Sequence, residues 1–194
     1  MKYADYVGSK SLTGPAVELF STADLKTFSR VENTDEDALL AELIIAARIA
    51  TEKKLSMSFI SQTRQVTFEA INIPTNSTVN IPFGPLISVQ TIKYYNSDDV
   101  LTTISSDDYK TDLLSGRVKF ETLPSLEDTP NALEINYTAG FGTAASDVPG
   151  DIILAVKFLA GFWIDNRELA KPISMTLVPA TYDALLFNYS QLLK

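Results

Sequence analysis

Alternation of apolar and polar residues marks the middle of the chain as β-structure. From Leu133 to Ala139 every second residue is apolar, and the residues between them are polar. This period of two places one face of a strand in a core and the other face in water. The same period starts near residue 61, and prolines, glycines and asparagines interrupt it up to residue 140. We therefore predict a β-rich region near 61–140, with strands at 86–95, 118–121 and 133–139.

Helical patterns flank this region on both sides. The stretch from Ile152 to Ile164 is apolar around almost its whole circumference, and only Lys157 interrupts it. A helix of this composition has to be covered on several sides. Pro149 favours a helix start, because proline in a first turn loses no hydrogen bond. The helices predicted in this way lie near 34–55, 149–167 and 181–192, and a short helix at 23–28 precedes them.

The long helix near 34–55 has recognisable ends. Asn33 or Thr34 can cap its first turn. The acidic residues at 35–37 and the lysines at 53–54 suit the two ends of the helix dipole. The apolar stripe predicted to be buried consists of Leu39, Leu40, Leu43, Ile44, Ala47 and Ala50, whereas Glu42, Arg48 and Glu52 are predicted to face elsewhere.

These elements predict an α+β fold in which a helical layer accompanies a central β-rich region. The length of 194 residues suits one domain, or one domain with an appendage. Residues 1–20 show no clean period, so we expect an N-terminal arm that is extended or ordered only by partners. Residues 21–168 form the predicted core domain. Residues 169–194 are expected to be a linker, bracketed by Pro172 and Pro179, and a C-terminal helix.

Composition excludes several kinds of site. The chain has no cysteine and no histidine, which removes disulfides, thiolate nucleophiles, Ser-His pairs and the usual zinc ligands. Sixteen basic residues against twenty-four acidic ones give a net charge of −8, without the basic excess that tight binding to duplex DNA requires. The first residues lack the apolar core of a signal peptide, and the longest apolar run is shorter than the ~20 residues of a membrane span. We therefore expect a soluble protein without membrane contact.

Three features invite a chemical interpretation. Gly140-Phe141-Gly142 joins a strand to a helix as a phosphate-binding loop does, but the third glycine and the Lys-Ser/Thr of such loops are missing. Acidic pairs or runs at 35–37, 98–99 and 107–108 are explained by helix capping and turn chemistry, and none has the spacing of a calcium loop. Tyr94-Tyr95 suits either cross-strand packing or single-stranded nucleic acid, which the net charge disfavours. We expect no metal, no cofactor and no enzymatic activity.

Several short motifs occur along the chain in the order typical of one known family. They are Thr22-Ala23-Asp24-Leu25-Lys26, the acidic turn and helix start at 33–40, Phe83-Gly84-Pro85-Leu86-Ile87-Ser88-Val89, Asp108-Tyr109 with Gly116-Arg117-Val118, the YTAGFG turn at 137–142, Asp147-Val148-Pro149 and Asn166-Arg167-Glu168. Together they resemble the head-tail connector, or adaptor, proteins of tailed bacteriophages, including the HK97-type connector family. The resemblance covers about residues 20–168.

This resemblance implies a structural virion protein of the neck, where the head meets the tail. It implies a closed ring of roughly twelve copies that binds the portal protein, extends the DNA channel and links the capsid to a stopper or tail-completion protein. Genomic DNA would pass through the ring without tight binding, which agrees with the acidic charge. Assembly would take place in the cytoplasm of the bacterial host.

Two groups of apolar residues are candidates for contacts in such an assembly. Phe158, Phe162 and Trp163 are expected either in the core or in a subunit interface. The C-terminal helix either folds back on its own domain or docks on the portal, and its candidate portal-binding residues are Tyr182, Leu185, Leu186, Phe187, Tyr189, Leu192 and Leu193. Two other functions stay open at this point: a β-rich binding or adhesion module with accessory helices, and a carboxylate-based hydrolase.

Overall fold

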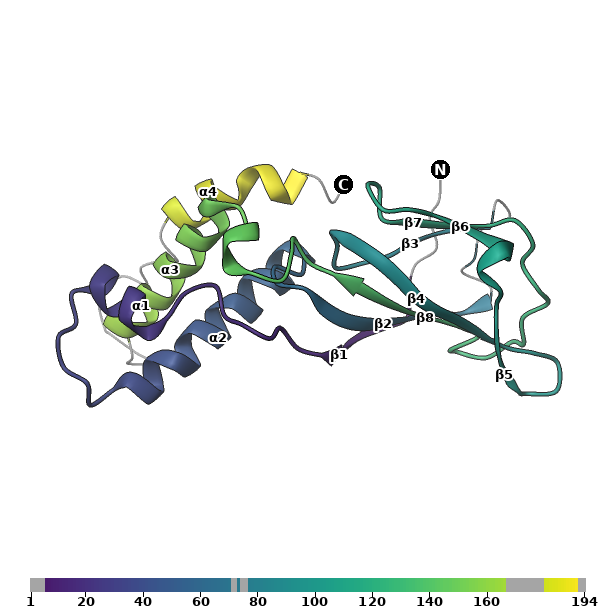
Figure 1. The fold of residues 1–194 in the computed structure, drawn as a ribbon, viewed down its shortest axis with the longest axis horizontal. Coiled ribbons are helices and arrows are strands. Elements are labelled where there is room, and N and C mark those ends of the chain that lie inside the picture. The colour runs from purple at the N-terminus through teal and green to yellow at the C-terminus, as the bar shows by residue number, and fades with distance from the viewer. Residues whose placement is uncertain (1–5, 71–72, 74–76, 167–179, 192–194) are drawn as a thin grey trace. The chain divides into compact units, whose positions relative to one another are not determined.

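A computed structural model describes residues 6–70, 73, 77–166 and 180–191 of the chain. It contains four α-helices and two antiparallel sheets in this described part, which confirms the predicted α+β fold and its β-rich centre (Figure 1). The chain divides into two compact units. The β unit consists of residues 1–16 and 57–141, and the helical unit of residues 17–56 and 142–194.

This division differs from the predicted one, in which residues 21–168 formed a single core domain. The chain passes from one unit to the other three times, after residues 16, 56 and 141. Each unit is therefore assembled from segments that lie far apart in the sequence. Gly14-Pro15 and Gly140-Phe141-Gly142 lie at two of these boundaries, but such short turns do not indicate which distant segments pack together.

The larger sheet of the β unit has five antiparallel strands in the order β1-β2-β8-β4-β5. Their bounds are Gly8–Thr13 for β1, Gln62–Phe68 for β2, Leu86–Tyr95 for β4, Leu101–Thr103 for β5 and Leu133–Ala139 for β8. The central strand β8 alternates buried and partly exposed residues along its whole length, as its sequence predicts. The predicted strands at 86–95 and 133–139 are confirmed at both ends.

A second sheet of three antiparallel strands completes the β unit. Its order is β3-β7-β6, with β3 at Thr78–Asn80, β6 at Tyr109–Asp112 and β7 at Arg117–Phe120. One hydrophobic core joins the two sheets, since Val79 and Val118 belong to the same buried cluster as Ile92 and Ile135. The β unit is thus a two-layered structure in which both sheets contribute an apolar face.

Part of the predicted N-terminal arm is a strand of this fold. Strand β1 pairs with β2 from Gly8 opposite Thr67 to Thr13 opposite Thr63. The arm is therefore extended, as expected, but from residue 8 its own chain orders it. Lys10 and a register shift between Ser11 and Thr13 lie on this edge strand, and both features discourage pairing with a further strand.

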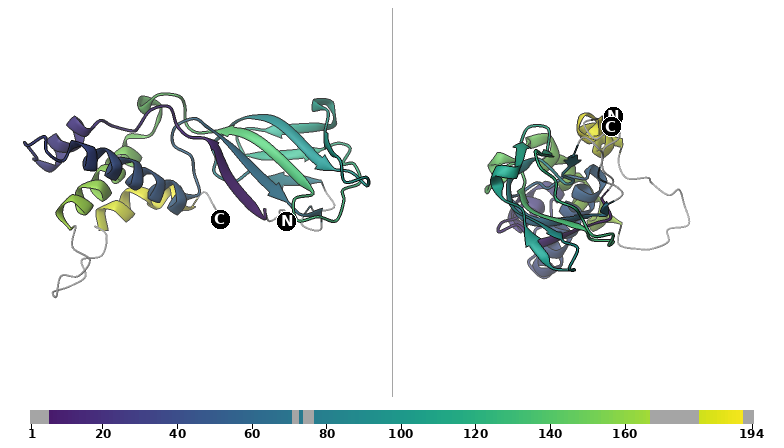
Figure 2. Two further views of the ribbon diagram at one scale, coloured as in Figure 1. Left: turned by 90° about the horizontal axis from the view of Figure 1, so that it is seen from below. Right: turned by 90° about the vertical axis from the view of Figure 1, so that its right-hand side faces the viewer.

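The helical unit contains α1 at Thr22–Ser29, α2 at Asp37–Leu55, α3 at Gly150–Asp165 and α4 at Ala180–Gln191. Helix α3 contacts the other three helices, which confirms that its apolar circumference is covered on several sides (Figure 2). Ser21 and Asp24 form a capping box at the start of α1. The predicted cap of α2 is wrong, because the helix starts after Glu36 and has no side-chain cap. Pro149 lies at the N-cap of α3, one position before the first turn.

Gly140 and Gly142 lie where β8 leads toward α3. Gly140 has φ +143°, and a Cβ atom there would lie 2.6 Å from the backbone nitrogen of Ser61. A Cβ atom on Gly142 would overlap the carboxylate of Asp147. This carboxylate also accepts a hydrogen bond from the backbone N–H of Ala144 at 2.9 Å. Gly140 therefore has a backbone conformation that other residues rarely adopt, and the absence of a side chain at Gly142 leaves room for the Asp147 carboxylate.

Candidate functional site

The C-terminal helix α4 docks on the helical unit through one of its sides. Tyr182 and Leu186 are buried, and α4 contacts both α2 and α3 (Figure 2). The Tyr182 hydroxyl lies 3.1 Å from the Thr51 hydroxyl of α2, and burial raises the pKa of Tyr182. Within this fold Tyr182 and Leu186 belong to the core. They are therefore not available to a partner, contrary to their place among the predicted portal-binding residues.

Polar contacts fix the same helix at both of its ends. The Tyr189 hydroxyl donates a hydrogen bond of 2.8 Å to the Asp151 carboxylate of α3. Burial, followed by the hydrogen bond to this carboxylate and its negative charge, raises the pKa of Tyr189 to about 12. Lys54 and Asp183 form an exposed ion pair of 2.6 Å near the start of α4. Exposed ion pairs of this kind contribute little to stability, so the buried side chains of Tyr182 and Leu186 supply most of the energy that holds α4 on the helical unit.

The outward side of α4 keeps apolar surface. Phe187 is 60% exposed, and Leu185 is half-buried. The other two candidates, Leu192 and Leu193, lie outside the described residues. Of the predicted portal-binding residues that the structure describes, Phe187 has by far the largest exposed fraction.

The three aromatic residues of α3 are partly buried. Phe158, Phe162 and Trp163 are all half-buried, and the Phe158 ring meets the Phe28 ring of α1 edge-on, with 5.3 Å between ring centroids. They contribute to the contacts among the helices and retain some accessible surface. Their expected role in the core or in a subunit interface stays a prediction.

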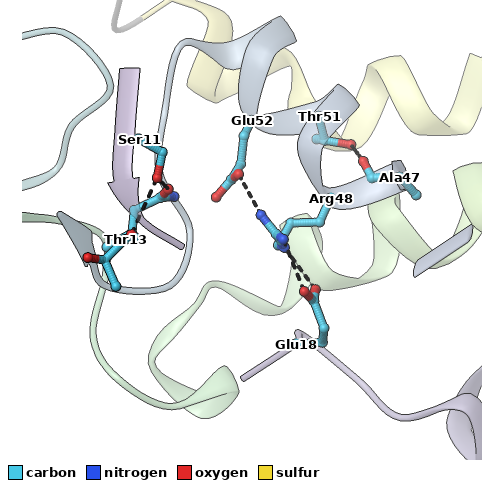
Figure 3. Close-up of polar contacts among 8 residues, drawn as sticks. Ser11, Thr13, Glu18, Ala47, Arg48, Thr51 and Glu52 are labelled. Atoms are coloured by element: carbon cyan, nitrogen blue, oxygen red, sulfur yellow. Dashed lines mark hydrogen bonds and ion pairs between the residues drawn. The ribbon is translucent and has the colours of Figure 1, made fainter. Parts of the chain in front are cut away.

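Helix α2 buries most of the stripe that its sequence predicts, and it also buries two charged side chains that were predicted to lie elsewhere. Arg48 and Glu52 are buried, although they were predicted to face away from the core. Arg48 donates hydrogen bonds to both carboxylate oxygens of Glu18, at 2.8 and 3.0 Å, and one of 2.9 Å to Glu52 (Figure 3). Burial lowers the pKa of Arg48, but these hydrogen bonds and charges outweigh burial and raise it overall. The three side chains form a buried ionic cluster.

The exposed side of α2 is correspondingly apolar. Leu39, Ile45 and Ile49 are each more than a third exposed, and Ala38, Ala41 and Ala46 are exposed beside them. Glu42 is the one exposed charge between Asp37 and Lys53. Leu40, Ile44 and Ala47 of the predicted stripe are buried as expected. A signal for this arrangement was present in the sequence, because the helix has apolar residues on every side and so cannot bury all of them.

A second exposed apolar feature lies in the β unit, at the turn between β6 and β7. Leu113 is 46% exposed and Leu114 is 99% exposed. The Asp112 carboxylate holds this turn by accepting hydrogen bonds from the backbone N–H groups of Leu114 and Ser115, at 3.1 and 3.2 Å. The exposure of these leucines was not predicted from the sequence.

The acidic residues at 98–99 and 107–108 lie in turns, as expected, whereas the run at 35–37 provides no side-chain cap for α2. Asp37 forms an ion pair of 2.8 Å with Lys26, and Asp98 and Asp107 lie in turns stabilised by Asn96 and Ser105. No group of three or more Asp and Glu side chains among the described residues has the geometry of a metal site. Of the helices in the part of the chain that the structure describes, none is long and apolar enough to cross a membrane.

Comparison with a family of known proteins gives a match over most of the chain. The family model described as "Head completion protein" matches residues 18–176. This range includes α1, α2, α3 and all strands except β1. No curated protein matches the sequence significantly.

Solved structures with the same fold come from the gene transfer agent (GTA) particle. A chain from the neck of the empty particle, computed with C6 symmetry, has a TM-score of 0.76 and 22% sequence identity, over 94% of this chain and 95% of that one. A chain from the virion of the native particle has a TM-score of 0.69 at 22% identity, over 91% and 94%. A chain from the native neck, computed with C12 symmetry, has a TM-score of 0.63 at 21% identity, over 90% and 94%. At these identities the likeness establishes a shared fold.

Proposed function

We propose that this chain, which belongs to the head completion protein family, is a structural head-tail connector in the neck of a virion. The observation that carries this proposal is the family match over residues 18–176. The fold shared with two chains from particle necks supports it along almost the whole chain. The motifs at 22–26, 83–89 and 137–142 that resemble head-tail connectors all lie inside the matched range.

The connector acts as a closed ring of roughly twelve copies between the portal protein and a stopper or tail-completion protein. The neck structures that share its fold were computed with sixfold and twelvefold symmetry, which supports a cyclic arrangement. The ring extends the DNA channel. Its net charge of −8 per chain favours passage of the genome over binding, because few cations are available to replace the counterions of the phosphates. The work of such a ring is mechanical, and the family assignment gives no support to the hydrolase or the adhesion module.

A ring of this kind should be visible as a defined increase in mass. Portal-bearing heads made without this chain, mixed with the purified protein, are expected to gain about twelve copies. Averaged electron micrographs should show new density at the portal vertex, and mass photometry of released portal complexes should give the copy number. Addition of one or two copies, or binding away from the portal vertex, would contradict the proposed function.

The outward side of α4 makes the portal contact. Phe187 supplies the largest exposed apolar side chain on this helix, and aromatic side chains are typical anchors of protein interfaces. Tyr182 and Leu186 hold the helix against α2 and α3 from the other side. A contact repeated around a ring can be weak in each copy and still hold the assembly together.

Substitutions at the neighbouring residues Leu186 and Phe187 separate the attachment of α4 to its own unit from the contact with the portal. Phe187→Ala is expected to weaken attachment to portal-bearing heads at least tenfold while it changes the free energy of unfolding by less than about 1 kcal/mol. Leu186→Ala is expected to lower the free energy of unfolding by about 2–5 kcal/mol, because it leaves a cavity under the helix. Urea melts followed by Trp163 fluorescence, together with co-sedimentation with heads, measure both quantities. Normal attachment of the Phe187→Ala protein would place the portal contact elsewhere.

A further inference from the structure

Two apolar surfaces among the described residues are exposed, and each lies in a different unit. We propose that neighbouring copies in the ring join through them: the tip of the β6-β7 hairpin of one copy, at Leu113-Leu114, docks on the exposed side of α2 of the next copy. This inference rests on the proposed ring. It adds the residues that form the contact between subunits.

The hairpin tip has the features of a docking element. A leucine that is 99% exposed leaves its whole side chain in water, where a polar turn residue would be more favourable. The Asp112 carboxylate also accepts a hydrogen bond of 2.5 Å from the Ser115 hydroxyl, in addition to those from the two backbone N–H groups. The turn is therefore fixed before any partner arrives, so that little conformational entropy is lost on docking.

The exposed side of α2 has the features of a receiving surface. Ile45 and Ile49 form its centre, and Ala38, Ala41 and Ala46 flank them. Alanines next to larger residues leave shallow depressions on a helix surface, into which a projecting leucine fits. The buried cluster of Arg48, Glu18 and Glu52 fixes the rotation of α2 so that this side stays outward.

Symmetry and charge favour a second copy of this chain as the occupant. A ring requires two different surfaces that meet head to tail, and here a projecting surface and a receiving surface occur in one chain. Residues 109–121 carry three basic side chains and two acidic ones, a net charge of +1, although the whole chain has −8. Residues 35–46 carry four acidic side chains and no basic one, and one of the four, Asp37, forms an ion pair with Lys26. The two surfaces therefore attract each other within an otherwise acidic protein.

Because the chain contains no cysteine, engineered cysteines test this contact directly. A protein carrying both Leu114→Cys and Ile45→Cys is assembled on portal-bearing heads and oxidised with copper phenanthroline. A ladder of linked copies on a non-reducing gel, up to the full ring, is expected. The matched control carries Val100→Cys with Ile45→Cys, since Val100 is an exposed residue at the tip of the other hairpin, between β4 and β5. It should give no ladder.

The other outcomes overturn the proposed contact. An equal ladder from the control, or dimers from Leu114→Cys alone, would mean that the tip meets other surfaces. Adducts of Leu114→Cys with a cysteine-substituted portal protein would assign the tip to the portal. Heads that hold the chain in normal amount but give no ladder would overturn this interface alone. Heads that hold no copies of the unsubstituted chain would overturn the proposed function and this interface with it.

A second variant measures the strength of the contact without crosslinking. Leu114→Asp places a charge at the tip, and the exposed position makes an effect on folding small. Association between copies is expected to fall about tenfold or more per contact, the factor that burial of one leucine side chain supplies. Incomplete rings on heads, with an unchanged urea melt, are the expected result. Complete rings at the normal protein concentration would overturn the proposal.

Discussion

Arg48→Ala is expected to lower the free energy of unfolding of the helical unit by about 3–5 kcal/mol. The guanidinium is buried and bonded to two carboxylates, Glu18 and Glu52. Removing it leaves two acidic groups near each other without their counter-charge, and Glu52 is itself buried. Trp163 is the chain's single tryptophan and lies in α3, so its fluorescence during urea unfolding reports the helical unit specifically.

Replacement of the whole ionic cluster provides the control. In the triple variant Glu18→Leu, Arg48→Met and Glu52→Leu no charge is left unpaired, and most of the lost stability should return. A loss below about 1 kcal/mol for Arg48→Ala would contradict the buried cluster. Equal losses for the single and triple variants would show that unpaired charge is not the cause of the lost stability.

Gly140→Ala is expected to lower the free energy of unfolding of the β unit by about 3 kcal/mol. The new Cβ atom would lie 2.6 Å from the nitrogen of Ser61 and 2.7 Å from the carbonyl carbon of Ile60, both backbone atoms that cannot move aside singly. The φ of +143° adds strain, because side-chain-bearing residues rarely adopt it. Hydrogen exchange of amides in β2 and β8 should accelerate accordingly, since the first residue pair of these strands, Gln62 and Ala139, is adjacent to this contact.

Gly150→Ala is the matched control for this substitution. A Cβ atom on Gly150 would meet no other atom within 4 Å, and the residue starts α3. The exchange rates in β2 and β8 should stay unchanged, and stability should change by less than about 1 kcal/mol. A Gly140→Ala protein as stable as the Gly150→Ala protein would show that the strand end can shift to accept a side chain.

Local patterns were sufficient for the elements themselves. Strands β4 and β8 were predicted with both ends correct, because alternation and bounding turn residues are properties of consecutive residues. Helix α3 was predicted almost as well from its apolar run, and α1 and α2 within three residues at each end. The short strands β1, β3, β5 and β6 were not among the predicted strands. A strand of this length is stabilised mainly by its partner, and the pairing of Gly8–Thr13 with β2 joins residues fifty or more positions apart.

The sequence alone determined the type of each long element, the acidic charge and the absence of cysteine and histidine chemistry. The family was recognisable from it as well. Only the tertiary structure decided which sides of α2 and α4 face outward. Both helices carry apolar residues on several sides, so that hydrophobicity does not distinguish the buried side from the exposed one. The choice depends on residues that are distant in the sequence. The Glu18 carboxylate accepts a hydrogen bond from the buried Arg48. The Thr51 hydroxyl lies within hydrogen-bond distance of the Tyr182 hydroxyl, and the Asp151 carboxylate accepts a hydrogen bond from Tyr189. Such long-range contacts, which the local pattern does not encode, leave Ile45, Ile49 and Phe187 exposed.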